Sequence, residues 1–269
     1  MTSYYDFARQ ILLGESLEDK LIDAPFEWSS WSEFALPSTP GRIGKISFSQ
    51  NKIKFPRKEN LNHDDKKAVA LHSFANHELL AIEMMAAALL VYPHHDEDSI
   101  RFKRGILTAL KDEQKHLLLY IDRLNELGYE FGDFPLNDFF WKQMPKLKTP
   151  AQYVAIMSLT FEAANLDFAQ YYSQIFRGFG DEKTATILET VLEDEISHVQ
   201  FGAHWLKKWR EDKSLWQYYL DCLPFPLTPA RGKGLGFDTS LHMKAVGDQE
   251  FIHKLSEYED NFLVTKRKS

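Results

Sequence analysis

Apolar residues recur at every third or fourth position through four long stretches of the chain, with polar residues between them. This spacing places the apolar side chains on one face of a helix, so it predicts four long helices. The ends of the stretches carry residues that start and stop helices, namely capping Asp and Thr, Gly and Pro. The expected helices are about Asp64–Tyr92 (stopped by Pro93), Asp98–Leu127 (capped by Asp98 and followed by Gly128), Thr149–Arg177, and Asp181–Trp209.

Short turns join the first of these helices to the second and the third to the fourth. Each pair is therefore expected to form an antiparallel hairpin. The intervening segment Tyr129–Lys148 is rich in loop residues and is long enough to cross from one hairpin to the other. The pattern predicts an all-α four-helix bundle at residues 61–210, made of two antiparallel hairpins with a crossover, in a chain that is a single domain overall.

The two ends of the chain, residues 1–60 and 211–269, are expected to be helical and irregular extensions, the first of them packed on the bundle. Clusters of Pro, Gly and Ser separate their short helical patterns. The expected segments are helices at Tyr4–Leu13 and Ser16–Ile22, an irregular stretch at Pro25–Pro56, a helix at Ser214–Leu223, a Pro/Gly-rich stretch at Pro224–Gly236, and a final helix ending near Phe262.

The five-residue pattern Asp-Glu-x-x-His occurs twice, at residues 112–116 and 194–198, once in each predicted hairpin. Glu and His three residues apart share one face of a helix, so each pair can reach the same point. A third Glu-x-x-His, at residues 250–253, has no preceding Asp and no mirrored partner. We interpret that third copy as ordinary helix surface and the first two as metal ligands.

Each hairpin also carries a glutamate on its other helix, and the segments around these two glutamates resemble each other. At 1.5 Å rise per residue, all four glutamates are expected at similar depth along the bundle and on its apolar seam. Burying so many ionisable groups without a compensating charge is costly, and metal cations supply that charge. The predicted ligands are Glu78, Glu113, His116, Glu162, Glu195 and His198. A bundle with solvated Glu and His faces is the alternative.

Four further acids lie close to these ligands in the sequence. Asp112 and Asp194 are expected to accept a hydrogen bond from the ligand imidazole of the opposite motif, which would fix its tautomer. Glu83 and Asp167 each follow a ligand glutamate by five residues, which turns them off the seam. We expect them to contact the ligands or a neighbouring helix, with direct metal binding as the alternative.

Other residues near the motifs have simpler roles. His72 and His77 are expected to be packing residues rather than ligands, and Tyr120 is expected to pack in the core rather than to act as a redox-active tyrosine. His94 and His95 lie in the first turn and are expected to be solvated.

The donor set and the composition limit the chemistry. Carboxylate and imidazole ligands without sulfur suit iron or manganese better than zinc. A single cysteine, Cys222, excludes an intramolecular disulfide and fits a reducing, cytoplasmic compartment. The net charge of −7 disfavours broad nucleic-acid binding. Met1–Leu13 lacks the pattern of a signal peptide, and Leu79–Tyr92 contains Glu83 and is too short for a membrane span.

Several segments resemble a known family. The segments are His77–Glu83, Phe161–Ala163, Gly128–Pro135 and Pro229–Gly236, together with the paired Asp-Glu-x-x-His motifs. They resemble a large bacterial family of uncharacterised ferritin-like proteins that is distantly similar to the tRNA-modifying hydroxylase MiaE. The resemblance implies a ferritin-like, non-haem di-iron fold in which the same six residues are the ligands. It implies no substrate.

We expect two bound iron ions, with manganese as the alternative, and an oxidoreductase that uses O₂ to oxidise or hydroxylate a small- or medium-sized organic substrate with an electron donor. A storage or detoxification protein for iron or manganese is a second hypothesis. A tRNA-modifying hydroxylase is a third, by analogy with MiaE. Basic residues that could meet phosphate, or form a solvated loop, are Arg42, Lys45, Lys52, Lys54, Arg57, Lys58, Lys66 and Lys67.

Overall fold

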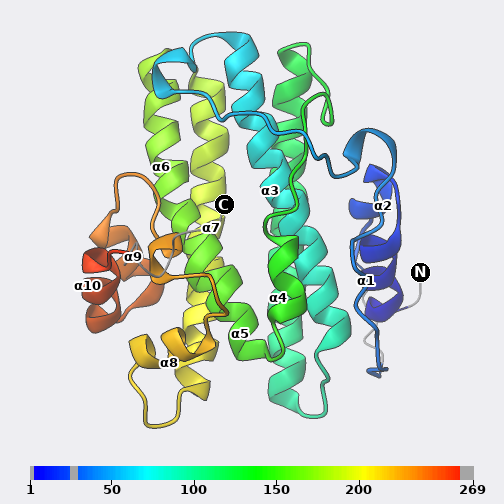
Figure 1. Ribbon diagram of the computed structural model, residues 1–269, viewed down its shortest axis with the longest axis vertical. Helices are drawn as coiled ribbons and strands as arrows, with labels where there is room; N and C mark the ends of the chain where they lie inside the picture. The colour runs from blue at the N-terminus through cyan, green and yellow to red at the C-terminus, as the bar shows by residue number, and fades with distance from the viewer. Residues whose placement is uncertain (1–2, 25–29, 261–269) are drawn as a thin grey trace. The chain divides into compact units, whose positions relative to one another are not determined.

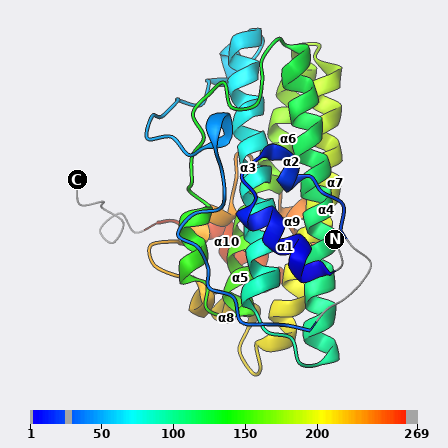
Figure 2. The same cartoon turned by 90° about the vertical axis from the view of Figure 1, so that its right-hand side faces the viewer.

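The computed structural model describes residues 3–24 and 30–260, and these residues fold into α-helices joined by loops (Figures 1 and 2). An isolated bridge pairs Phe48 with Leu136. The α-helices of the described residues are α1 Tyr4–Leu13, α2 Leu17–Lys20, α3 Asp64–Val91, α4 Glu97–Glu126, α5 Pro150–Ile156, α6 Ala163–Gly178, α7 Glu182–Trp209, α8 Leu215–Cys222, α9 Thr239–Val246 and α10 Gln249–Glu257. The shorter helical turns are η1 Gly44–Ile46, η2 Lys58–Asn60, η3 Trp141–Lys146, η4 Met157–Glu162 and η5 Pro229–Gly232.

The structure confirms the four long helical stretches and corrects two details. Helix α4 is capped by Asp96 and not by Asp98, because the Asp96 side chain accepts a hydrogen bond from Ser99 N at 2.7 Å and the Asp96 backbone N–H donates to Ser99 Oγ at 3.2 Å. The third stretch is not one uninterrupted α-helix. Its middle, η4, is a π-helix that lies between α5 and α6. A single π-helical turn adds a residue without breaking the helix, so the apolar spacing alone does not reveal it.

The predicted final helix is also wrong in detail. Two helices, α9 and α10, occupy that part of the chain, because Gly247 adopts a left-handed conformation (φ 62°) that ends α9. Helix α10 ends at Glu257, and the predicted end near Phe262 lies outside the described residues. Residues 25–29 of the predicted irregular stretch also lie outside them.

The chain divides into two units, and each is described by itself. Unit 1 comprises Met1–Pro145 and Gly178–Ile187, and unit 2 comprises Lys146–Arg177 and Leu188–Ser269. In unit 1, α3 and α4 form the expected antiparallel hairpin (Figure 1). Helices α1 and α2 pack on α3. Within its own unit, α3 is therefore contacted by α4, α1 and α2.

One described helix, α3, is long and apolar enough to cross a membrane by length and composition alone, but 89% of its most apolar window is buried inside the structure. That burial is the property of a core helix. The turn after α3 also differs from expectation. His94 was predicted to be solvated but is buried, with its Nδ1 3.0 Å from Tyr4 Oη and 3.1 Å from Lys103 Nζ. Tyr4 and Lys103, from α1 and α4, cover this turn. His95 is exposed, as predicted.

In unit 2, α6 and the later part of α7 lie side by side, joined by ion pairs between Arg177 and Glu189 (Figure 1). The C-terminal helices pack with each other and against α5 and η4. Helix α8 contacts α5, α10 contacts both α8 and α9, and η5 contacts the π-helix η4. The π-helix is thus enclosed by the C-terminal part of its own unit.

Candidate metal centre

Unit 1 brings together three of the predicted ligands, Glu78 of α3 and Glu113 and His116 of α4. All three side chains are buried. One ligand atom from each lies within 4.8 Å of those from the other two. His116 Nδ1 is 3.4 Å from Glu113 Oε2, as expected for residues one helical turn apart. These three residues are called the unit 1 triad below.

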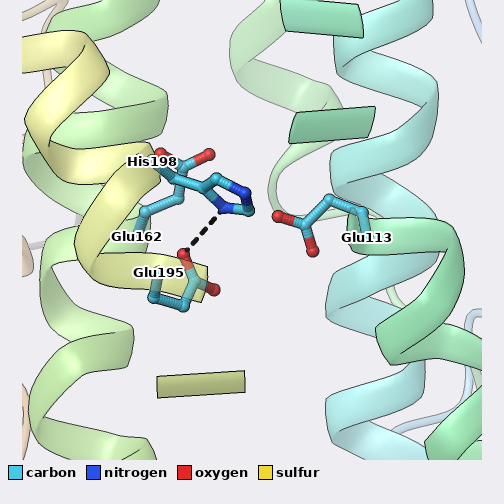
Figure 3. Close-up of side chains that lie close together, drawn as sticks. All are labelled: Glu113, Glu162, Glu195 and His198. Atoms are coloured by element: carbon cyan, nitrogen blue, oxygen red, sulfur yellow. Dashed lines mark ion pairs between the residues drawn. The ribbon is translucent and has the colours of Figure 1, made fainter. Parts of the chain in front are cut away.

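Unit 2 brings together the other three predicted ligands in the same way. Glu162 is the last residue of η4, and Glu195 and His198 lie one turn apart on α7. Their ligand atoms also fall within 4.8 Å of one another, and all three are buried. Figure 3 shows Glu195 and His198 on α7 with Glu162 beside them, and its dashed line marks the 3.4 Å ion pair between Glu195 Oε2 and His198 Nδ1. These residues are the unit 2 triad.

The charge of each triad matches one divalent cation. Two carboxylates and one neutral imidazole carry a formal charge of −2, and the three groups offer only oxygen and nitrogen atoms. Buried carboxylates that close together repel each other strongly unless a cation or protons lie between them. Each triad therefore fits a hard or borderline divalent ion bound by oxygen and nitrogen.

The π-helix sets the position of Glu162. Thr160 Oγ1 bonds to the carbonyl oxygen of Ala155, five residues earlier, at 2.7 Å, and lies 2.9 Å from Tyr219 Oη. Gly202 of α7 packs directly against η4, since a Cβ at this position would lie 2.1 Å from Ser158 Cβ. Only a glycine allows α7 to approach η4 this closely. π-helical turns often occur at functional sites, and here one carries a candidate ligand.

Glu83, five residues after Glu78, binds the N-terminal segment of unit 1. Arg42 donates to both of its carboxylate oxygens, from Nε at 2.9 Å and from Nη2 at 2.6 Å. Lys20 Nζ lies 3.3 Å from Oε1. The side chains of Glu83 and Lys20 are fully buried and that of Arg42 is almost so. Glu83 thus fastens the N-terminal segment to the helix that carries Glu78.

Asp167, five residues after Glu162, has the corresponding contacts in unit 2. Its two oxygens accept hydrogen bonds from the backbone N–H groups of Gly234 at 2.8 Å and Asp238 at 3.0 Å. His242 Nε2 is 3.0 Å from Asp167 Oδ2, and Phe237 stacks on the His242 ring. The acid that follows each ligand glutamate therefore holds a terminal part of its own unit.

Comparisons with known proteins place the chain in a family. A family model described as "Protein of unknown function (DUF455)" matches residues 8–253. The chain belongs to this family. An "Uncharacterized protein" of Haemophilus influenzae is 26% identical to this DUF455 chain over 153 residues, which are 55% of the chain and 53% of that protein. The chain thus spans about half the length of this curated relative. No solved structure matches the DUF455 chain.

The remaining predicted residues of this DUF455 chain take varied places. Asp112 and Asp194 are partly buried, and their expected hydrogen bonds to imidazole stay a prediction. His72 is a packing residue as expected: its Nε2 accepts from Gly132 N at 2.9 Å, and burial lowers the pKa of His72 to about 4. His77 stacks on Phe140.

Tyr120 is buried and packs on Phe74, as expected. The third Glu-x-x-His, on α10, is surface as predicted, since Glu250 and His253 are both more than half exposed. This motif has the same spacing as the two buried motifs, but its side chains are exposed, so it is a natural control for them.

The basic residues singled out in the sequence fall into two groups. Four are paired with acids: Arg42 with Glu83, Lys45 with Glu130 and Asp133, Lys66 with Asp65, and Lys67 with Asp64 and Asp181. The other four are exposed: Lys52, Lys54, Arg57 and Lys58. Nearby acids therefore offset the charge of four of these eight basic residues.

Sequence reasoning missed one side chain next to the triads. Asn165 of α6 donates from Nδ2 to Glu195 Oε1 at 2.7 Å. It lies three residues after Glu162, and that spacing on one helix face was the available signal.

Proposed function

We propose that this protein is a non-haem dinuclear carboxylate oxidoreductase, in which the unit 1 triad and the unit 2 triad each hold one metal ion. The observation that carries the proposal is the occurrence of the same buried Glu, Glu and His set in both units. The ligands follow the same order in each half of the chain, Glu and then Glu-x-x-His, and this repetition supports one ion at each triad.

The corresponding fold is a ferritin-like four-helix bundle, which we also propose. In such bundles two helices each give one Glu and the other two each give a Glu-x-x-His, all projecting inward. Here α3 and the η4–α6 stretch carry the single glutamates, and α4 and α7 carry the motifs. The oxygen-rich donor set favours iron, with manganese as the alternative.

When bound, the two ions would supply the chemistry of O₂ activation. Insertion of one oxygen atom of O₂ into a C–H bond consumes two electrons and two protons and releases one water, so the reaction requires an electron donor besides the substrate. The carboxylates of the triads would bind and orient the ions, and burial of these side chains would exclude bulk water. Asp112 and Asp194 would hold the ligand imidazoles in one tautomer. The proposed substrate is a small- or medium-sized organic molecule.

The test begins with metal content. Purified protein is freed of metal, titrated with Fe(II) without oxygen, and then exposed to O₂ while the near-ultraviolet absorption is followed. We expect two ions per chain and a new absorption band on oxidation. Glu113→Ala and His198→Ala each remove one ligand from one triad and should lower the stoichiometry toward one.

The matched control is His253→Ala, which removes the histidine of the exposed third motif. It should leave both the stoichiometry and the band unchanged. Binding of no iron or manganese by the unmodified protein would refute the proposal. So would equal losses in the control and in the two ligand variants.

A tRNA-modifying hydroxylase is a second candidate, favoured by the four exposed cations Lys52, Lys54, Arg57 and Lys58. Phosphate contacts by these side chains would make RNA binding fall steeply with salt. Neutralising all four should abolish salt-sensitive binding of tRNA. An unchanged affinity would leave the small-molecule oxidoreductase as the better proposal.

A further inference from the structure

Asn165 stands out because its amide is aimed at a candidate ligand. Its Nδ2 is 2.7 Å from Glu195 Oε1, a short hydrogen bond to a charged acceptor. The side chain is partly buried and belongs to α6, whereas Glu195 belongs to α7. Asn165 therefore fixes the Glu195 carboxylate from the neighbouring helix.

The two oxygens of Glu195 have different surroundings. Oε1 accepts the hydrogen bond from Asn165, and Oε2 lies 3.4 Å from Nδ1 of His198. The oxygen near His198 and the imidazole nitrogen thus converge on one point inside the unit 2 triad. The hydrogen bond engages one lone pair of Oε1 and therefore favours binding of an ion through Oε2 alone.

The corresponding position in the other half of the sequence has no such donor. Aligning Glu162 with Glu78 places Asn165 opposite Ala81, and the methyl group of an alanine cannot donate a hydrogen bond. The repeat is therefore broken at one residue that touches a candidate ligand.

We propose that Asn165 is a positioning residue of the metal centre: it holds Glu195 as a ligand through one oxygen and thereby strengthens metal binding at the unit 2 triad. This inference rests on the proposed function. Partners that orient metal ligands in this way typically contribute about 10- to 100-fold to metal affinity.

The test uses the full chain freed of metal and titrated with Mn(II) in a calorimeter. Asn165→Ala and Asn165→Leu both remove the donor, and the leucine keeps the bulk of the side chain. Each should weaken one of the two binding steps by about 10- to 100-fold and leave the other step unchanged. Gln174→Ala, which removes an exposed amide from the same helix, is the control and should change neither step.

Two further measurements separate a role in ligand positioning from general loss of structure. Co(II)-loaded Asn165→Leu should show weaker visible absorption than the unmodified protein, since Glu195 becomes able to bind through both oxygens and raises the coordination number. In a Glu195→Ala background, Asn165→Leu should cause no additional loss of Mn(II) affinity, because the amide then has no carboxylate to hold.

The outcomes distinguish this inference from the proposal beneath it. Failure of the unmodified protein to bind Mn(II) or iron would refute the dinuclear centre, and this inference with it. Normal binding of two ions by the unmodified protein and by both Asn165 variants would refute the role of Asn165 alone. Equal weakening of both steps, or a full additional loss in the Glu195→Ala background, would also refute it.

Discussion

Replacing Glu83 by glutamine should destabilise unit 1 far more than removal of an exposed ion pair. The substitution keeps the shape of the side chain but leaves two buried cations, Lys20 and Arg42, without their anion. Arg42 cannot lose its proton, so its charge stays buried. Burial already lowers the pKa of Lys20 while Glu83 opposes that shift, so loss of Glu83 should push Lys20 further toward the neutral form.

Removing one partner of a buried ion pair lowers the free energy of unfolding by about 3–5 kcal/mol. Glu83→Gln should fall in this range, because Arg42 donates two hydrogen bonds to Glu83. The matched control is Glu130→Gln. Glu130 pairs with Lys45, but both side chains are more than half exposed, so the cost should be under about 1 kcal/mol. The measurement is urea denaturation of each variant followed by circular dichroism.

Hydrogen exchange adds a local test of the same reasoning. The amides of α1 and α2 should exchange faster in Glu83→Gln, since these helices reach α3 partly through Lys20. Adding Arg42→Met should recover part of the lost stability by removing the unpaired charge. Equal stability of Glu83→Gln and Glu130→Gln would show that the buried cluster does not hold this part of the chain.

Three other substitutions test separate features. Asp167→Ala should cost about 1–3 kcal/mol and expose the C-terminal part of unit 2 to proteolysis, because it leaves the partly buried N–H groups of Gly234 and Asp238 without their acceptor; an unchanged cleavage rate would contradict this. Gly202→Ala should cost about 1–3 kcal/mol in thermal unfolding, because its Cβ would overlap Ser158, whereas Gly178→Ala meets nothing and should be neutral or stabilising. Burial lowers the pKa of Lys103 from 10.5 to about 7, so between pH 7 and 10.5 the unfolded chain binds more protons than the folded one. The free energy of unfolding should therefore rise with pH in this range, by at most about 1.4 kcal/mol per pH unit. Lys103→Met should flatten that slope in denaturation curves recorded at different pH.

The sequence predicts the helices and the grouping of Glu and His within each motif, because both depend on local spacing. That the six candidate ligands bind metal stays a prediction. A Glu and a His three residues apart share a helix face whatever surrounds them, and the structure encloses both motifs. The choice of Asp96 over Asp98 as a cap depends on a reciprocal bond with Ser99, which is also local and could have been found.

The spacing of apolar and polar residues does not predict features that depend on tertiary packing. The partners of Glu83 lie more than forty residues earlier in the chain, and nothing in the spacing of Arg42 or Lys20 points to them. His94 is buried because Tyr4 of α1 covers its turn. The π-helix adds one residue to a turn, and the apolar residues on either side of it keep a helical spacing.

The contrast between Glu83 and Asp167 has a consequence for how the family can vary. Glu83 is held by two side chains, so any relative that keeps this acid must keep cations at the positions of Lys20 and Arg42. Asp167 is held largely by backbone N–H groups, which every residue except proline supplies. At the C-terminal anchor, co-variation with Asp167 should therefore be confined to His242, whose side chain contacts it. Gly234 itself should be kept, because a Cβ there would lie 2.6 Å from Ala164 O, whereas its neighbours in the loop can vary.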